Sequence, residues 1–204
     1  MLYGIVDLGY VGRDEALAVG EDLLRGGVDF LQLRAKGEAP ESLLELACGL
    51  AELGRHYGKP FVVNDHVELA RECGADGVHL GQDDGELAAA RAVLGEGKLV
   101  GRSTHSPEQA RAALAEGADY IGFGPLFPTP TKEGRPAIGL EDVAGVMQEV
   151  GARIPVFCIG GIKEETLATV LTAGACHVVI VSALLQAEDI AEATRELRAR
   201  VVRD

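Results

Sequence analysis

Three polar side chains alternate along one short apolar segment near the start of the chain. Gln32, Arg34 and Lys36 occupy every second position of the sequence Leu-Gln-Leu-Arg-Ala-Lys. Residues two apart in a β-strand point to the same face, so these side chains would share one face. Two buried cations are costly unless an anion or a carboxylate meets them. The spacing therefore predicts an anion-binding site, the alternative being charged residues solvated at a strand end.

Carboxylates follow two further apolar segments. Asn64-Asp65 ends the first of these segments, and Gly81-Gln82-Asp83-Asp84 follows the second. If the two segments are neighbouring strands, Asp65 and Asp84 come within reach of one cation. Mg²⁺ suits such a pair, because it takes hard oxygen ligands and combines one or two carboxylates with phosphate oxygens and waters. The alternative is that each aspartate caps the helix after it.

The stretch from 124 to 136, Gly-Pro-Leu-Phe-Pro-Thr-Pro-Thr-Lys-Glu-Gly-Arg-Pro, fits neither a helix nor a strand. It holds four of the eight prolines of the chain. Proline keeps the backbone extended and removes N–H donors, so Thr129, Thr131 and Lys132 would be presented on a stiff frame. A loop of this kind between two regular elements is typical of a binding loop.

Glycine and hydroxyl groups follow the last apolar segments. Gly160-Gly161 comes after one of them, and Val181-Ser182 ends the next. Paired glycines let the backbone approach a ligand closely, and N–H groups at a helix start donate to phosphate oxygens. These residues predict a phosphate cradle. Ser103 and His105, in Gly-Arg-Ser-Thr-His, add a hydroxyl and an imidazole.

The elements that would position these residues alternate between short β-branched segments and longer segments of helical period, a pattern typical of βαβ construction. The predicted strands are Tyr3–Val6, Phe30–Arg34, Phe61–Asn64, Gly77–Leu80, Leu99–Gly101, Tyr120–Phe123, Val156–Ile159 and Val178–Val181. The predicted helices are Asp14–Arg25, Ser42–Tyr57, Glu68–Cys73, Glu86–Leu94, Pro107–Glu116, Leu140–Val150, Glu164–Thr172 and Leu184–Val201, the last being the longest.

Four similar tetrapeptides support the count of eight strand–helix units. They join helix ends to the second, fourth, sixth and eighth predicted strands, at Gly27–Phe30, Gly74–Gly77, Gly117–Tyr120 and Gly174–His177. Eight units in 204 residues predict a compact α/β protein, a single-domain (β/α)8 TIM barrel over residues 1–204. A doubly wound open sheet is the rival fold. In a barrel, residues after every strand converge on the C-terminal face, so the polar residues above would form one site.

Composition excludes several partners. The formal charge of −13 argues against nucleic acid and anionic membranes, which need a basic face. The first residues lack a basic region followed by an apolar run, and no window approaches the roughly 18 apolar residues of a membrane span, so a cytoplasmic protein is expected. The cysteines show no CxxC pairing, and buried free thiols are expected at Cys48, Cys73, Cys158 and Cys176.

Along its whole length the chain resembles the thiamine phosphate synthase family, also called thiamine-phosphate pyrophosphorylase. The similar segments lie at 32–36, 64–65, 78–84, 101–105, 122–132 and 159–162, and Thr-Pro-Thr-Lys at 129–132 is the most specific of them. Ala35 departs from the glutamate of many relatives. It points away from Arg34 and Lys36, so their roles would not change.

The resemblance implies a Mg²⁺-dependent transferase of thiamine biosynthesis. It would condense hydroxymethylpyrimidine diphosphate with hydroxyethylthiazole phosphate, giving thiamine phosphate and pyrophosphate through a pyrimidine cation. The residues implied to bind the diphosphate are Gln32, Arg34, Lys36, Asn64 and Lys132. Asp65 and Asp84 would bind the metal, and Ser103 the pyrimidine. The residues implied to bind the thiazole phosphate are Thr129, Thr131, Gly161, Val181 and Ser182. Arg34, Lys36, Lys132 and Ser103 would contribute to catalysis.

Two other functions stay open. A thiazole tautomerase of the same fold would use His105 for proton transfer and need no Mg²⁺, but its loop usually departs from the Pro-Thr-x-Thr-Lys pattern kept here. A non-catalytic thiamine-precursor binding protein would have lost turnover, which the retained Asp65, Asp84 and Lys132 argue against. His79 lies within a predicted strand and is expected to be a hydrogen-bonded core residue. Relatives tend to associate, so a homo-oligomer is possible.

Overall fold

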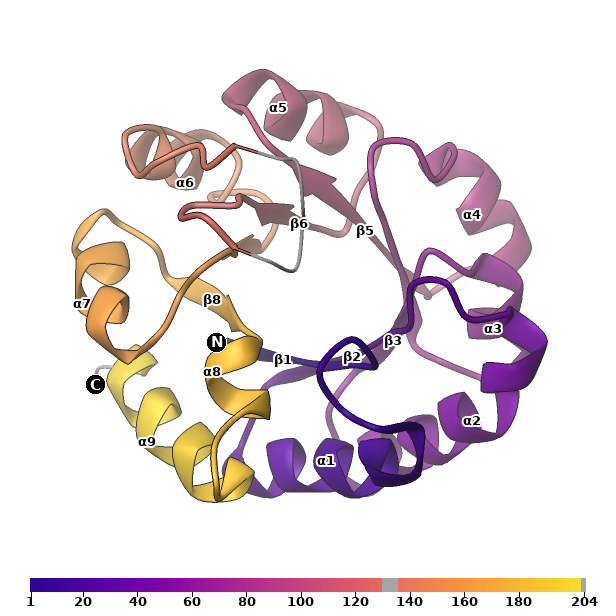
Figure 1. The fold of residues 1–204 in the computed structure, drawn as a ribbon. Coiled ribbons are helices and arrows are strands. Elements are labelled where there is room, and N and C mark those ends of the chain that lie inside the picture. Colours follow the sequence, from indigo (N-terminus) through magenta and orange to yellow (C-terminus); the bar gives the residue numbers. More distant parts are fainter. Residues whose placement is uncertain (130–135, 203–204) are drawn as a thin grey trace.

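Eight parallel strands form a closed ring with helices around it (Figure 1). The computed structural model describes residues 1–129 and 136–202. Each strand pairs with the next, and β8 pairs with β1 from Leu2↔Val178 to Gly4↔Ile180. The strands are β1 (Leu2–Asp7), β2 (Phe30–Arg34), β3 (Phe61–Asn64), β4 (Gly77–Leu80), β5 (Leu99–Thr104), β6 (Tyr120–Phe123), β7 (Val156–Cys158) and β8 (His177–Ile180). The predicted (β/α)8 barrel is confirmed, and the open-sheet alternative is wrong.

Helices connect the strands because parallel neighbours require a crossover. They are α1 (Arg13–Gly26), α2 (Pro40–Tyr57), α3 (Val67–Glu72), α4 (Leu87–Leu94), α5 (Pro107–Ala115), α6 (Val143–Glu149), α7 (Glu164–Thr172), α8 (Ser182–Leu185) and α9 (Ile190–Val201). Figure 1 shows α1 to α7 and α9 outside the ring of strands. No helix in the described part of the chain is long and apolar enough to cross a membrane.

The side chains form two separate cores. Outward strand residues pack against the helices, and Ala35 belongs to this layer, which confirms that it points away from Arg34. Inward residues fill the barrel. Among these, an aromatic floor has neighbouring ring centroids 4.5 to 6.2 Å apart. This floor consists of Tyr3, Phe30, Tyr120 and Phe157. It closes the barrel interior below the strand ends where the site residues lie.

Two element predictions are wrong in an informative way. β5 continues to Thr104 instead of ending at Gly101, because the Thr104 hydroxyl donates to the Gly122 carbonyl and both strands continue side by side. The expected helix from 184 to 201 is two helices, because Asp189 accepts the Glu192 N–H and caps α9 separately. Among the described helices α2 is therefore the longest, with 18 residues.

The four cysteines are free thiols, as expected, but they are not all buried. Cys73 and Cys158 are buried and Cys48 is partly buried, whereas Cys176 is exposed. Cys176 precedes β8 at the N-terminal end of the barrel, where the chain turns over the surface. The expectation of a buried thiol is wrong at this position.

Candidate active site

The three alternating residues of the β2 segment sit at increasing distance from the barrel centre. Gln32 is buried, and its Nε2 donates to the Tyr3 hydroxyl at 2.6 Å. Arg34 donates from Nη1 to Asp7 Oδ2 at 2.7 Å. Lys36 lies beyond the strand, largely exposed, with Nζ 4.0 Å from Asp65 Oδ2. The three residues thus follow one another from the barrel interior to the C-terminal mouth of the barrel, and the Asp7 carboxylate holds Arg34 in place.

Asp65 and Asp84 interact directly at the ends of β3 and β4. Burial, together with the neighbouring Asp84 carboxyl, raises the pKa of Asp65 to about 6. Burial works against the charged form of Asp84 also, but hydrogen bonds from Asp65 and from the Gly81 N–H hold its pKa below the ordinary value. The backbone of Asp65 has φ 64°, in the left-handed region. A non-glycine residue held there is uncommon and is frequent at functional sites.

This carboxyl pair fits a magnesium ion. Neither aspartate caps a helix, since the cap positions of α3 and α4 are His66 and Glu86. Two carboxylates brought together raise each other's cost of ionisation, and a divalent cation relieves that repulsion. Among the described residues no group of three or more His, Cys, Asp and Glu side chains could hold a metal ion. Waters and substrate oxygens would complete the ligands, as is usual for Mg²⁺.

A cavity occupies the barrel interior above the aromatic floor. Its polar lining includes Gln32, Arg34, Asn64, His79 and Ser103. Its walls are otherwise apolar or aromatic, which suits a flat heterocycle with a few polar edges. Arg34 and Asn64 lie on the side of the cavity towards Asp65.

A hydrogen-bond chain runs along one side of this cavity. It begins with Gln32 and the Tyr3 hydroxyl, which lies 3.4 Å from the Tyr120 hydroxyl. Tyr120 then meets His79 Nδ1 at 3.2 Å, and His79 Nε2 meets Ser103 Oγ at 2.9 Å. Burial raises the pKa of both tyrosines, so the phenols remain neutral hydrogen-bonding groups. The chain fixes the orientation of Ser103 and Gln32, and the expected core role of His79 is confirmed.

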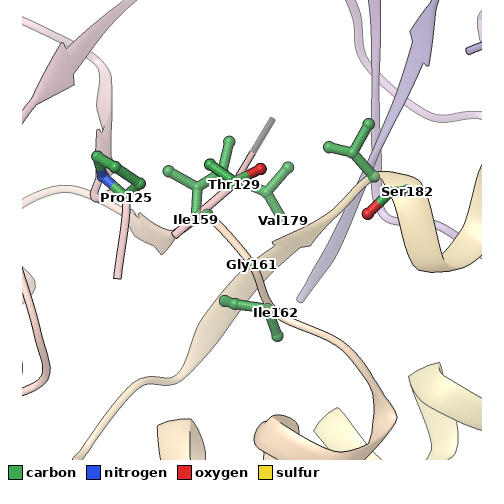
Figure 2. A pocket seen from close by; sticks show the side chains of 9 residues that line it. Pro125, Thr129, Ile159, Gly161, Ile162, Val179 and Ser182 are labelled. Carbon is green, nitrogen blue, oxygen red and sulfur yellow. The ribbon is translucent and has the colours of Figure 1, made fainter. Parts of the chain in front are cut away.

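A second cavity opens beside the first. Figure 2 shows its lining, with Thr129, Ile159 and Val179 drawn between Pro125 and Ser182. The structure brings together four predicted residues here, namely Thr129, Gly161, Val181 and Ser182. In the four-residue helix α8 the Leu184 and Leu185 N–H groups donate to Val181 O, so the two earlier amides, of Ser182 and Ala183, are the candidates for a phosphate. Both cavities share Ile159, Val179 and Val181 as a common wall.

The described part of the proline loop is tied to the glycine pair. The Leu126 N–H donates to Ile159 O at 2.9 Å, and the Phe127 N–H donates to Gly160 O at 3.1 Å. These bonds place Thr129 at the second cavity. His105 Nδ1 bonds the Gly124 carbonyl at the start of the loop, so this imidazole supports the loop. Thr131 and Lys132 lie outside the described residues.

The sequence did not single out several of the site residues, because most of them have no distinctive pattern in the segment where they lie. Asp7 is buried at 1% exposure against Arg34, a contact that depends on the pairing of β1 with β2. Tyr3 and Tyr120 read as ordinary apolar strand residues. Arg102 is buried at 5% exposure on the outer side of β5. The one available signal was the position of Asp7 after an apolar run, the same signal that identified Asp65.

Fold and site together define a (β/α)8 barrel with a carboxylate pair, cationic groups and a glycine turn around two adjoining cavities. Comparisons with known proteins point to one family. The family model of thiamine monophosphate synthase matches residues 2–184. A thiamine-phosphate synthase of Thermus thermophilus is 48% identical over 181 residues, covering 89% of this chain and 86% of the relative. Another, from Gloeobacter violaceus, is 45% identical over 175 residues, covering 86% of this chain and 51% of the relative.

The solved structure of thiamine phosphate pyrophosphorylase from Pyrococcus furiosus superposes with a TM-score of 0.87 at 34% identity, covering 98% of this chain and 94% of that one. The chain belongs to the thiamine monophosphate synthase family. It spans about half the length of the Gloeobacter relative and most of the Thermus one. The expected family, a transferase family of thiamine biosynthesis, is confirmed by these matches.

Proposed function

We propose that this protein is a thiamine phosphate synthase. It joins the pyrimidine-methyl group of 4-amino-5-hydroxymethyl-2-methylpyrimidine diphosphate to the nitrogen of 4-methyl-5-hydroxyethylthiazole phosphate, giving thiamine phosphate and pyrophosphate. The observation that carries this proposal is the common wall of the two cavities, Ile159, Val179 and Val181. Two substrates bound in adjoining cavities meet at that wall, which is what a condensation requires.

The residues of the mouth match the leaving group. Breaking the carbon–oxygen bond of the diphosphate leaves charge on pyrophosphate and a cation on the pyrimidine-methyl group, which the thiazole nitrogen then attacks. Arg34 and Lys36 stand where the departing charge develops, and Gln32 and Asn64 donate from the adjoining cavity wall. Cations held in place before the reaction stabilise that charge without reorganisation. No protein nucleophile is needed.

The metal, the pyrimidine and the thiazole phosphate are assigned to separate groups of residues at the C-terminal end of the barrel. Asp65 and Asp84 would hold Mg²⁺, which would supply positive charge to the departing pyrophosphate. Ser103 binds an edge of the pyrimidine in the barrel cavity. Thr129, Thr131, Gly161, Val181 and Ser182 bind the thiazole phosphate, and Lys132 binds the diphosphate. A single domain over 1–204, a cytoplasmic location, a possible homo-oligomer and the absence of nucleic-acid partners stay predictions.

One incubation tests the proposal. The protein is mixed with both substrates and Mg²⁺, and thiamine phosphate and pyrophosphate are sought by mass spectrometry. Both products are expected, and their formation should stop when the thiazole phosphate is omitted or the metal is chelated. Absence of both products at saturating substrate would rule the synthase out, and a non-catalytic binding protein would then remain. A tautomerase would instead convert its thiazole substrate without Mg²⁺ or diphosphate.

Asp65→Asn tests the metal assignment. The change keeps the shape of the side chain but removes the charge, so turnover should fall by about 10²- to 10³-fold with the fold retained, the usual size for loss of an aligned electrostatic partner. Lys132→Ala should lower turnover at least about tenfold, because it removes a cation proposed to bind the diphosphate. Asp83→Asn, beside Asp84 in the same loop, is the matched control and should keep most of the rate. Equal rates in Asp65→Asn and Asp83→Asn would contradict the assignment.

A further inference from the structure

The loop that carries Asp84, residues 81–85 between β4 and α4, is here called the metal loop. Within it the Gly81 N–H donates to Asp84 Oδ2 at 2.7 Å, and the Asp84 N–H donates to Gly81 O at 3.3 Å. These bonds set the carboxylate relative to the start of the loop. They do not set the loop relative to the barrel, because both partners belong to the same short segment. Another group must supply that connection.

Arg102 contributes to it from the neighbouring strand, beside the Gln82 side chain, which donates to Ser103 O. It lies opposite Leu80 in the pairing of β4 with β5 and points to the outer side of the barrel. Its Nη1 donates to Gly81 O, and its Nη2 donates to Gly85 O at 2.7 Å. One planar guanidinium therefore grips the first and last carbonyls of the metal loop. A planar fork does this at little entropic cost, whereas an ammonium is a single point charge.

The surroundings of Arg102 indicate that its role is to form these two hydrogen bonds and not only to pack against its neighbours. The side chain is buried at 5% exposure, and its two terminal nitrogens donate to neutral carbonyls. The adjacent outward position on β5 is held by Val100, an apolar residue in the outer core. A buried cation is costly where an apolar side chain would pack as well. What the arginine adds is the two directed hydrogen bonds to the loop.

The same strand also faces the barrel cavity. Ser103, the next residue on β5, points inward and contacts His79, and its carbonyl accepts the Gln82 Nε2 at 2.6 Å. Two successive residues of β5 thus hold the metal loop on one side and the pyrimidine pocket on the other. Their spacing is fixed by the strand. β5 therefore links the loop that carries Asp84 to the strand position that carries Ser103.

We propose that Arg102 is a positioning residue, which holds the metal loop so that Asp84 stands beside Asp65 and both can bind one divalent cation. The proposal rests on the proposed function, because it assigns Arg102 to the magnesium site of that reaction. Arg102 touches no reacting atom. It acts through the carbonyls of Gly81 and Gly85.

The test measures cation binding directly, with Mn²⁺ as probe. Free Mn²⁺ is followed by electron paramagnetic resonance in the presence of pyrophosphate, for the wild-type chain and for Arg102→Met. Loss of an outer partner of a metal ligand costs about 10- to 100-fold in metal affinity, and we expect a loss of that size. Hydrogen exchange of the amides at 81–86 should become faster as the loop loosens. Arg102→Lys, which keeps the charge but not the fork, should fall between the two.

Arg91→Met is the matched control. Arg91, on α4, also donates to two carbonyls, Lys98 O and Gly117 O, and pairs with the Asp119 carboxylate, all at the N-terminal end of the barrel. It should lower stability without changing the Mn²⁺ affinity. Wild-type Mn²⁺ affinity and loop exchange in Arg102→Met would overturn the proposal, as would equal weakening in both methionine variants. If Arg102→Met does not fold, by circular dichroism, Arg102→Lys decides by the same measure.

The two proposals fail separately. A wild-type chain that binds Mn²⁺ with pyrophosphate but makes no thiamine phosphate overturns the synthase and leaves the role of Arg102 standing. A wild-type chain that makes thiamine phosphate, with Arg102→Met binding Mn²⁺ normally, overturns the role of Arg102 alone. A wild-type chain that binds no Mn²⁺ overturns the magnesium site and with it the role of Arg102.

Discussion

The carboxylate of Asp7 determines where the Arg34 guanidinium points. Asp7 is almost wholly buried at the end of β1, with Oδ2 on Arg34 and Oδ1 accepting the Gly9 N–H at 3.0 Å. A flexible arginine at a cavity mouth would otherwise sample many rotamers and have to be ordered by the substrate. Because Asp7 holds the Arg34 side chain in one position, the proposed diphosphate would not have to order it on binding.

Asp7→Asn should therefore affect both stability and substrate binding. Loss of a hydrogen bond between charged groups lowers the free energy of unfolding by about 2 kcal/mol, and the KM for the pyrimidine diphosphate should rise as Arg34 becomes free to move. Chemical denaturation and steady-state kinetics measure the two effects. Asp22→Asn is the control, since Asp22 pairs with Arg25 on the exposed side of α1. Equal small effects in both variants would contradict the role of Asp7.

Sequence reasoning found the site residues that follow strands and missed those defined by pairing. Arg34 and Asp65 are visible because a charged residue after an apolar run is unusual in itself. The partner of Arg34 lies 27 positions away, and only the register of β1 on β2 brings it close. Arg102 reads as part of a loop in the sequence, since an arginine is rarely buried on the outer face of a strand. Such contacts depend on tertiary structure that no local pattern encodes.

At the scale of elements, the turn after β7 shapes the proposed phosphate site. Gly161 has φ 65°, and a Cβ there would lie 2.7 Å from Phe127 Cβ and 3.0 Å from Pro128 O. The glycine thus serves two purposes. It permits the left-handed backbone, and it leaves room for the proline loop to lie against the turn.

Gly161→Ala should consequently displace the proline loop and raise the KM for the thiazole phosphate at least about tenfold, in addition to a strain of about 1–2 kcal/mol. Gly58→Ala separates the two effects. Gly58 has φ 63°, and nothing lies within 4 Å of a Cβ built there, so this change introduces strain without a clash. It should lower the melting temperature and leave the KM unchanged. A wild-type KM in Gly161→Ala would contradict the close approach.

Elements at the opposite end of the barrel are joined by Asp29. It accepts the Leu2 N–H at 3.0 Å and Arg198 Nη2 at 3.1 Å, and Lys59 Nζ lies 3.4 Å away. Burial works against its charge, but these donors hold the pKa of Asp29 below the ordinary value. Its stabilising contribution is therefore present above the unfolded pKa, about 3.9, and is lost as the pH falls through the folded pKa.

Asp29→Asn should lower the free energy of unfolding most at about pH 7, and the difference from the wild-type chain should shrink below about pH 4. Denaturant titrations at several pH values measure this difference. A constant difference down to about pH 3 would show that the carboxylate charge is not what joins β1 and α9.

The boundaries of elements were predictable where glycine and aspartate mark them. β2, β3, β4 and β6 begin and end as predicted, each soon after a Gly-x-Asp turn or a helix-ending glycine. β5 was predicted too short because Arg102, Ser103 and Thr104 read as loop residues, although each has a partner within the barrel. Polar residues extend a strand when tertiary partners satisfy them. The break before α9 had a local signal, Asp189 with Glu192 three residues later, that a continuous helical period concealed.

For the molecule as a whole, an acidic exterior surrounds a mouth where cations gather. The chain carries 32 acidic and 19 basic Lys and Arg residues, yet Arg34 and Lys36 stand together where the proposed diphosphate would bind. An acidic surface keeps the protein dispersed and repels polyanions. Small anionic substrates would then be recognised at the mouth, where Arg34, Lys36 and the proposed Mg²⁺ offset the charges of Asp7, Asp65 and Asp84. The proposed selectivity for small phosphates over nucleic acids follows from this arrangement.

The closed sheet predicts that the barrel unfolds as one unit. Removing any strand from a closed ring would expose two unpaired edges, so no part of the ring is expected to remain folded alone. Tyr3 on β1 and Tyr120 on β6 report on the interior, since both lie in the aromatic floor. Near-ultraviolet dichroism of the tyrosines should therefore change at the same denaturant concentration as far-ultraviolet dichroism of the helices. Two separate transitions would mean that part of the barrel, and with it one of the adjoining cavities, folds independently.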